Sequence, residues 1–139
     1  MWDAVRAMPA RNVEVARALS ELWNEGVRAV PTEYLDPAVE LESPFSSVSG
    51  VPYRGHVGIE QWVRDVDEHF SEWRNHIEDV RAIGNAVITQ GRLHGRGRGS
   101  DVELDQPCAI VMDFGRDHRI TRVRIYWDVH TALEAVGLG

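Results

Sequence analysis

The distribution of apolar residues along the chain predicts two amphipathic helices in its first half. The first follows Asn12, a candidate N-cap, and stops before Gly26, and its apolar positions share the spacing of one helical face. These positions are Val15, Ala16, Leu19, Leu22 and Trp23. The second helix is predicted from about Val57 to Trp73, with one apolar stripe opposite a charged face. Its stripe consists of Ile59, Trp62, Val63, Val66, Phe70 and Trp73.

Beyond the second helix the apolar period changes from about 3.6 residues to about 2, which is typical of strands. The predicted strands are His76–Ile83, Ala86–His94, Gln106–Phe114 and Ile120–Trp127. An earlier short strand, Val39–Glu42, follows a helical or turn segment at residues 33–37 and ends at Ser43 and Pro44, because proline disfavours helix in the residue before it. Residues 46–55 are rich in Ser, Gly and Pro and predict the longest loop, and loops of that length are often functional.

A short helix is predicted near the end of the chain. Thr131 to Glu134 form a candidate capping box at its start, and Gly137 ends it. Helices and one strand thus precede an antiparallel meander. This order favours a single α+β domain over residues 1–139, in which a curved sheet wraps the N-terminal helices.

Alternation assigns the faces of the predicted strands. In the last strand Val123, Ile125 and Trp127 share the face expected to meet the helices, while its arginines share the other face. Residues 108–112 are apolar without interruption, which predicts that both faces of that strand are covered. The helices would supply one cover, and a second subunit is the most economical source of the other. We therefore expect a homodimer formed through the outer face of the sheet.

Composition narrows the function classes. The chain has 15 Lys and Arg against 22 Asp and Glu, a formal charge of −7, which opposes non-specific binding to nucleic acid or to an anionic membrane. All of its basic residues are arginine, so Schiff-base lysine chemistry and a Walker A phosphate loop are excluded. No stretch approaches the ~20 apolar residues of a membrane span, and the N-terminus does not resemble a signal peptide. We expect a cytoplasmic protein that uses no cofactor.

Two weaker patterns are set aside. Asp65, His69 and Glu72 have a helical spacing that could hold a metal, but they lie on the solvated face of the predicted helix. The segment 95–99 alternates Gly and Arg as RNA-binding segments do, but it is one short loop in an acidic protein. The one cysteine, Cys108, excludes an internal disulfide and a paired-cysteine metal site. We predict neither a metal nor a nucleic-acid partner.

Four segments carry a resemblance to a known family: residues 35–40, 53–59, 91–100 and the ending from Ile125 to Leu138. Over about residues 12–138 the chain resembles SnoaL-like proteins of the nuclear transport factor 2-like superfamily. The resemblance implies a cone-shaped α+β fold with a deep apolar pocket and a dimeric assembly. The superfamily includes polyketide cyclases, ketosteroid isomerases, dehydratases and proteins without known activity, so the fold alone does not decide the chemistry.

The resemblance excludes one activity. The alignment keeps the pocket tryptophan of ketosteroid isomerases at Trp127. The tyrosine, the general base and the oxyanion acid of those enzymes fall on Leu19, Ser43 and Ile110. A steroid isomerase needs a base and two acidic donors in a dry pocket, so the chain does not have this activity.

Polyketide cyclases end in His-Trp-Asp, and their aspartate acts as acid and base. The corresponding residues here are Tyr126, Trp127 and Asp128, so the resemblance gives Asp128 that role. Desolvation at the rim of an apolar cone would raise the pKa of such a carboxyl and let it transfer a proton beside a carbonyl. The alternative is that Asp128 caps the last helix. The two interpretations predict pKa shifts of opposite sign.

Other side chains are candidates for the pocket. Glu42 and His94 stand near strand ends, where they enter the pocket mouth or form ordinary surface ion pairs. Gln106 shares its strand face with Ile110 and Met112. Trp23, Tyr53 and Trp62 can stack on a flat ligand or form plain core. The predicted pocket wall is one continuous apolar surface of Trp127, Ile125, Ile110 and Met112, with Trp62 or Trp23 opposite.

Two hypotheses of function follow. The first is a cofactor-independent enzyme that performs acid/base chemistry, such as cyclisation, isomerisation, dehydration or hydrolysis, on a small apolar carbonyl compound. The second is a non-catalytic protein that binds an apolar ligand or serves as a dimerisation module. The loss of the strongest carboxylates of the family favours the second.

Overall fold

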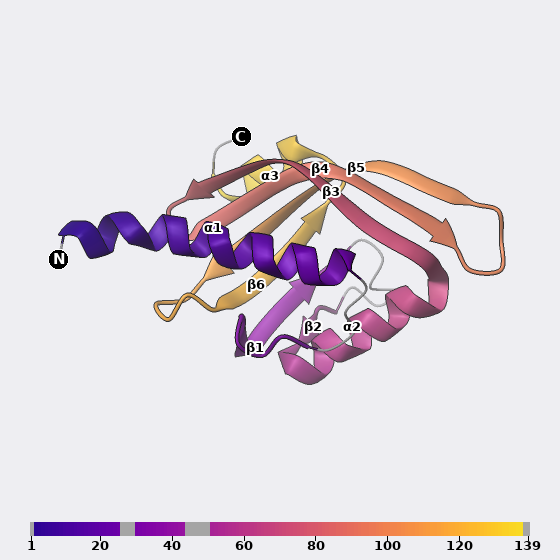
Figure 1. Cartoon of the computed structure of the whole chain (residues 1–139), viewed down its shortest axis with the longest axis horizontal. Coiled ribbons are helices and arrows are strands. Elements are labelled where there is room, and N and C mark those ends of the chain that lie inside the picture. The colour runs from indigo at the N-terminus through magenta and orange to yellow at the C-terminus, as the bar shows by residue number, and fades with distance from the viewer. Residues whose placement is uncertain (1, 26–29, 44–50, 138–139) are drawn as a thin grey trace.

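A computed structural model of the chain describes residues 2–25, 30–43 and 51–137, with side chains described from Ala10 onward. Of the loop predicted at 46–55, residues 46–50 lie outside the described residues, whereas Tyr53 and Arg54 form a short strand and Gly55 begins a helix. Along the chain, the elements are α1 (Trp2–Asn24), β1 (Leu35–Glu42), β2 (Tyr53–Arg54), α2 (Gly55–His69), β3 (Phe70–Ile83), β4 (Ala86–Gly97), β5 (Glu103–Phe114), β6 (Ile120–Tyr126) and α3 (Val129–Ala135). Figure 1 shows α1 lying lengthwise across the sheet, with α2 below it.

The strands form one six-stranded sheet in the order β2-β1-β6-β5-β4-β3. The pair β1 and β6 is parallel, and the other neighbouring strands are antiparallel, so the sheet is mixed. Its two outer strands, β2 and β3, do not pair with each other, so the sheet does not close into a barrel. The predicted α+β class, with a mixed sheet beside the helices, is confirmed.

The main core lies between the helices and one face of the sheet, here called the inner face. Leu19 of α1 and Ile59 of α2 are fully buried against Leu93, Met112 and Val123 of the central strands. The predicted inward faces of the last two strands are therefore correct, since Val123 and Ile125 belong to this cluster while Arg122 and Arg124 point the other way.

The outer face of the sheet has a second, smaller core. Ala109 and Val111 of β5, fully buried, pack with Ala132 of α3. Leu133 and Tyr126 border this cluster. The cover that residues 108–112 require is thus supplied by α3 of the same chain, where we expected a second subunit. The uninterrupted apolar run no longer argues for a homodimer.

The first helix begins well before its predicted start. It runs from Trp2, so Asn12 lies inside the helix and is not its N-cap. Asn12 is 4% exposed, and its Oδ1 lies 2.9 Å from Nδ1 of His118 in the β5–β6 turn. His118 adopts a positive φ of 61°, a conformation unusual for a residue other than glycine. A buried polar side chain in α1 is thereby paired across the fold, which no local pattern shows.

The second helix ends earlier than predicted, at His69, and Phe70 and Trp73 belong to β3. The end is fixed by the Gly and Arg segment that we had set aside as a nucleic-acid motif. Arg98 donates from Nε to the carbonyl of Asp67 (2.8 Å) and from a terminal nitrogen to that of Phe70 (3.2 Å). A guanidinium at the C-terminal end of a helix donates hydrogen bonds to its free carbonyls. Its positive charge also interacts favourably with the negative end of the helix dipole.

A bulge bends β3 between Ile77 and Asp79. Gly91 of β4 pairs with Ile77 at this point. A Cβ atom built on Gly91 would lie 1.9 Å from the carbonyl oxygen of His76, so the two backbones approach too closely for any side chain. No helix in the described part of the chain combines the length and apolar composition that crossing a membrane requires.

Candidate functional site

An apolar cavity lies between the two long helices and the inner face of the sheet. Every layer contributes to its lining, which consists of Ser20, Trp23, Asn24, Trp62, Trp73, Asn75, Leu93, Cys108, Ile110, Met112 and Ile125. Its open volume is about 30 Å³. This is enough for one or two water molecules and is far below the roughly 300–1,000 Å³ of typical ligand sites.

The indole rings of Trp23, Trp62 and Trp73 fill much of the space between the two long helices and the inner face of the sheet. The rings of Trp23 and Trp62 lie 5.1 Å apart between centroids, and Trp62 meets Trp73 edge to face at 6.4 Å. Phe70 packs on Trp73 at 5.0 Å. The three tryptophans line the cavity and give it one aromatic wall.

Buried polar atoms around this wall have no hydrogen-bond partner. They are Nε1 of Trp23, Nε1 of Trp62 and Oδ1 of Asn75. Trp62 and Asn75 are only 4% and 9% exposed. Leaving a buried donor or acceptor unpaired costs about 1–3 kcal/mol, so such atoms are rare in a finished core. Trp23, Trp62 and Asn75 all line the cavity, so two unpaired N–H donors and one unpaired acceptor belong to side chains of its wall.

The chemistry of this lining is limited. Among the residues that line the cavity in the described part of the chain there is no Asp, Glu, His or Arg. Its one ionisable group with a resolved shift is Cys108, where burial raises the pKa of the thiol to about 11. At neutral pH the thiol stays protonated and is a poor nucleophile. The described lining of the cavity therefore supplies no general acid or base.

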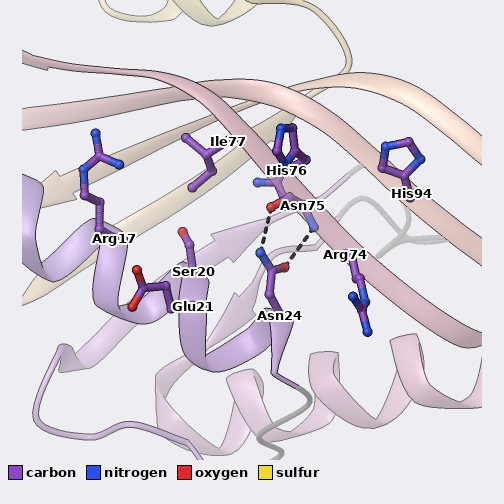
Figure 2. Close-up of a pocket in the computed structure, with 9 residues that line it drawn as sticks. All are labelled: Arg17, Ser20, Glu21, Asn24, Arg74, Asn75, His76, Ile77 and His94. Atoms are coloured by element: carbon purple, nitrogen blue, oxygen red, sulfur yellow. Dashed lines mark hydrogen bonds between the residues drawn. The ribbon is translucent and has the colours of Figure 1, made fainter.

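A second, polar hollow of about 440 Å³ opens on the molecular surface between α1 and β3, and we call it the outer groove (Figure 2). Its lining comprises Arg17, Ser20, Glu21, Asn24, Arg74, Asn75, His76, Ile77 and His94. Ser20, Asn24 and Asn75 line both the outer groove and the apolar cavity. The two hollows therefore meet at these three side chains.

Asn24 and Asn75 hold the meeting point together. Asn24 donates from Nδ2 to the backbone carbonyl of Asn75 at 2.8 Å and accepts from the backbone N–H of Asn75 at 2.9 Å. Figure 2 shows these two bonds joining the end of α1 to the middle of β3. Both bonds of the Asn24 amide go to the backbone of Asn75, and the side-chain oxygen of Asn75 is left without a hydrogen-bond partner.

Five of the predicted ligand-binding residues line the cavity: Trp23, Trp62, Ile110, Met112 and Ile125. Trp127 packs against the main core without lining the cavity. Gln106 is exposed and does not line the cavity, although it shares the inner face and pairs with the buried Leu93 of β4. Sequence reasoning did not assign six further lining residues to the site. The apolar ones, Trp73, Leu93 and Cys108, lie in patterns that pointed to burial, whereas the polar ones, Ser20, Asn24 and Asn75, had no such signal.

Tyr53 also lies away from the cavity. Its hydroxyl donates to Oδ2 of Asp65 in α2 at 2.5 Å. Burial, together with this carboxylate, raises the pKa of Tyr53 to about 12. The phenol therefore ties β2 to α2 in its protonated form.

The predicted catalytic residues are not brought together. Glu42 accepts a hydrogen bond at 2.8 Å from Arg122. It thus forms the ion pair that we gave as the alternative to a role in the pocket. His94 lines the outer groove, with Nδ1 3.8 Å from Oδ1 of Asp105. Asp128 is exposed at the start of α3. None of these three side chains lines the apolar cavity.

Asp128 occupies the N-cap of α3, three residues before the predicted capping box. One of its carboxylate oxygens accepts from the backbone N–H of Thr131 at 2.8 Å, and the other accepts from the Thr131 hydroxyl at 2.9 Å. The backbone bond, followed by the side-chain bond, lowers the pKa of Asp128 below its usual value. This geometry favours the capping alternative, in which the aspartate is structural.

We expect the capping role of Asp128 to appear in its titration. Because its folded-state pKa is lowered, Asp128 stabilises the protein above its unfolded-state pKa, and this contribution disappears as the pH falls through the folded-state pKa. Asp128→Ala should lower the melting temperature at pH 7 more than Asp128→Asn, whose amide oxygen still caps the helix. Carboxyl NMR titration checks the shift directly, and a raised pKa would contradict the capping role.

Comparison with known proteins gives the family. A model of the SnoaL-like domain matches residues 15–123. No curated protein matches this sequence. Bal32a, from a soil-derived mobile gene cassette, is 22% identical with a TM-score of 0.75 over 91% of this chain and 97% of its own. A candidate SnoaL-like polyketide cyclase from Jannaschia sp. CCS1 is 20% identical with a TM-score of 0.74 over 95% of each chain.

A third similar structure is that of TerC co-crystallised with polyporic acid. It is 19% identical with a TM-score of 0.70 and covers 89% of this chain and 96% of its own. At these identities the three structures share the fold with this chain. Because the SnoaL-like model spans most of the sequence, from the first helix to the last strand, the protein belongs to the SnoaL-like family.

Proposed function

We propose that this protein binds a small, flat, largely apolar molecule in the cavity between α1, α2 and the sheet. The observation that carries the proposal is the set of unpartnered polar atoms on an otherwise apolar wall: Nε1 of Trp23, Nε1 of Trp62 and Oδ1 of Asn75. An apolar molecule with an oxygen acceptor would satisfy an indole N–H while its ring stacks on the tryptophans.

The ligand enlarges the cavity when it binds. An open volume of about 30 Å³ cannot hold an organic ring, so at least one indole must turn aside or the ligand must extend into the outer groove. Trp23 and Trp73 are the indoles best placed to move, because both are only partly buried whereas Trp62 is buried. Binding should therefore change tryptophan fluorescence.

The cavity supports binding without catalysis better than acid/base catalysis. Its described lining holds no carboxylate or imidazole, and Cys108 is protonated at neutral pH. Asp128, the residue with a catalytic role by resemblance, caps α3. Two proteins of similar fold hold organic molecules, namely TerC with polyporic acid and a protein from Catenulispora acidiphila in complex with trimethylamine. These complexes support a binding role in this fold.

A titration with 2-acetylnaphthalene tests the proposal, because this neutral probe combines a flat ring with one carbonyl acceptor. We expect saturable binding by calorimetry and by quenching of tryptophan fluorescence. Trp62→Phe keeps an apolar ring but removes the N–H donor. It should weaken binding of the ketone by about tenfold, the worth of one hydrogen bond.

Trp127→Phe is the matched control, since Trp127 packs on the core without lining the cavity. It should leave the affinity unchanged. The proposal is wrong if the probe shows no saturable binding. It is also wrong if Trp127→Phe weakens binding as much as Trp62→Phe does.

A further inference from the structure

We infer that the outer groove is an anion-binding subsite, so that the ligand is an amphipathic organic acid whose ring enters the apolar cavity while its carboxylate stays in the groove. This inference rests on the proposed function and names the chemical class of its ligand. It depends on the charges of the outer groove, on its connection to the cavity and on the donors within that cavity.

The arginines of the outer groove are unusual in this protein. Most arginines with described side chains are engaged in ion pairs with carboxylates: Arg11, Arg54, Arg81, Arg92, Arg96, Arg98, Arg119, Arg122 and Arg124. Arg64 bonds instead to the amide of Gln61. Within the described part of the chain, Arg17, Arg74 and Arg116 have neither kind of partner, and two of these three line the outer groove.

Two free guanidinium groups create a local positive charge in a protein whose formal charge is −7. The groove lining contains one carboxylate, Glu21, and two imidazoles, His76 and His94. Asp105 stands close to His94 at 3.8 Å but is bound more tightly by Arg92 at 2.8 Å. A guanidinium binds a carboxylate through two parallel hydrogen bonds, so Arg17 and Arg74 suit an organic acid.

The groove and the cavity are close enough to serve one ligand. Ser20, Asn24 and Asn75 belong to both linings, and Figure 2 shows Arg17 and Arg74 on opposite sides of the Asn24–Asn75 pair. A molecule that passes this pair can have its charged end beside one of the two arginines and its ring against the tryptophans. A hydroxyl on that molecule can donate to the unpartnered Oδ1 of Asn75.

The donors inside the cavity argue against a cationic ligand. The faces of tryptophan rings attract cations. Here, however, the indole N–H groups of Trp23 and Trp62 are themselves unpaired donors, and the groove adds two guanidinium groups. Each of these groups repels a cation and attracts an oxygen acceptor, so an acid is favoured over an amine of the same size.

The decisive experiment compares three probes that share one ring system: 2-naphthoate, 2-acetylnaphthalene and 2-naphthyltrimethylammonium. Binding to the full chain is measured by calorimetry at pH 7 and low salt. We expect 2-naphthoate to bind at least about tenfold more tightly than the ketone, and the ammonium probe to bind more weakly than either. Raising the salt concentration should weaken the binding of 2-naphthoate and leave the binding of the ketone unchanged.

Exchanging both groove arginines for glutamine, R17Q with R74Q, should remove the advantage of the acid over the ketone without changing the affinity for the ketone. Both side chains are exposed, so the variant is expected to fold. Arg116→Gln is the matched control, because it removes one unpaired guanidinium that does not line the groove. It should preserve the preference for the acid.

The outcomes separate this inference from the proposed function. If the ketone binds and 2-naphthoate binds no more tightly, or if R17Q with R74Q leaves the preference intact, the anion subsite is wrong and the apolar binding function stands. If 2-naphthoate binds and the ketone does not, and the double variant loses the preference for the acid, the anion subsite stands. The role proposed for the indole N–H donors of the cavity is then wrong. If no probe binds, both are overturned.

Discussion

Gly91→Ala is expected to destabilise the protein by about 3 kcal/mol or more and to lower its melting temperature by roughly 10 °C. The added methyl group would lie 1.9 Å from the carbonyl oxygen of His76 and 3.0 Å from Cα of Ile77. Both atoms are backbone atoms of β3, so no side-chain rotation relieves the contact. The two strands must separate at the bulge for the variant to fold. Thermal unfolding followed by circular dichroism measures the effect.

Gln90→Ala provides the control, because Gln90 is the exposed neighbour of Gly91 on the same strand. Its effect should stay within about 0.5 kcal/mol, as for most surface substitutions. If Gly91→Ala unfolds at the same temperature as the parent protein, the pairing of Gly91 with the β3 bulge is not as described.

Ile110→Asp should cost about 4 kcal/mol at neutral pH, because it places a carboxylate among buried apolar side chains. Ile110 is 8% exposed, belongs to the main core and faces the cavity. Burial would raise the folded-state pKa of the new carboxyl above its unfolded value of about 3.9. The unfolded state then binds fewer protons than the folded state between these two pKa values, so stability falls as the pH rises through this range.

The loss in free energy of unfolding that Ile110→Asp causes, relative to the parent protein at the same pH, should therefore become smaller as the pH falls towards 4. This loss is called the deficit below. Ile110→Asn has nearly the same size and no charge, so its deficit should not depend on pH. Urea unfolding at pH 4, 6 and 8 tests both variants. Equal deficits at all three pH values for the aspartate variant would show that water reaches this position and that the cavity is not dry.

Strand alternation was enough to predict which residues face the helices, because a residue's side of a strand follows from its parity. The inner placement of Ile110, Met112 and Ile125 was predicted in this way and is observed. The boundary between α2 and β3 was not predictable by the same reasoning. Phe70 and Trp73 continue the spacing of the α2 stripe, yet they also suit the strand in which the structure places them. Arg98, the residue that closes the helix, lies far along the chain.

The site depends on contacts that no local pattern contains. Asn24 and Asn75 are 51 residues apart, and each looks like an ordinary polar residue until α1 is packed on β3. The cover of β5 was inferred correctly, but its source was not, because a short C-terminal helix gives no signal of the face on which it folds back. Asp128 was ambiguous for a different reason: a carboxylate before a helix suits both a cap and a pocket rim, and only its bonds to Thr131 distinguish them.

The open sheet also has to avoid recruiting a strand from another molecule, since unpaired edges favour aggregation. One edge is β2, which is two residues long and therefore has few backbone groups with which another strand could pair. The other is β3, whose N–H at Asn75 is taken by the side chain of Asn24. The contact that joins the groove to the cavity therefore also protects the middle of the exposed edge. Loss of Asn24 would open a place where a foreign strand can begin to pair.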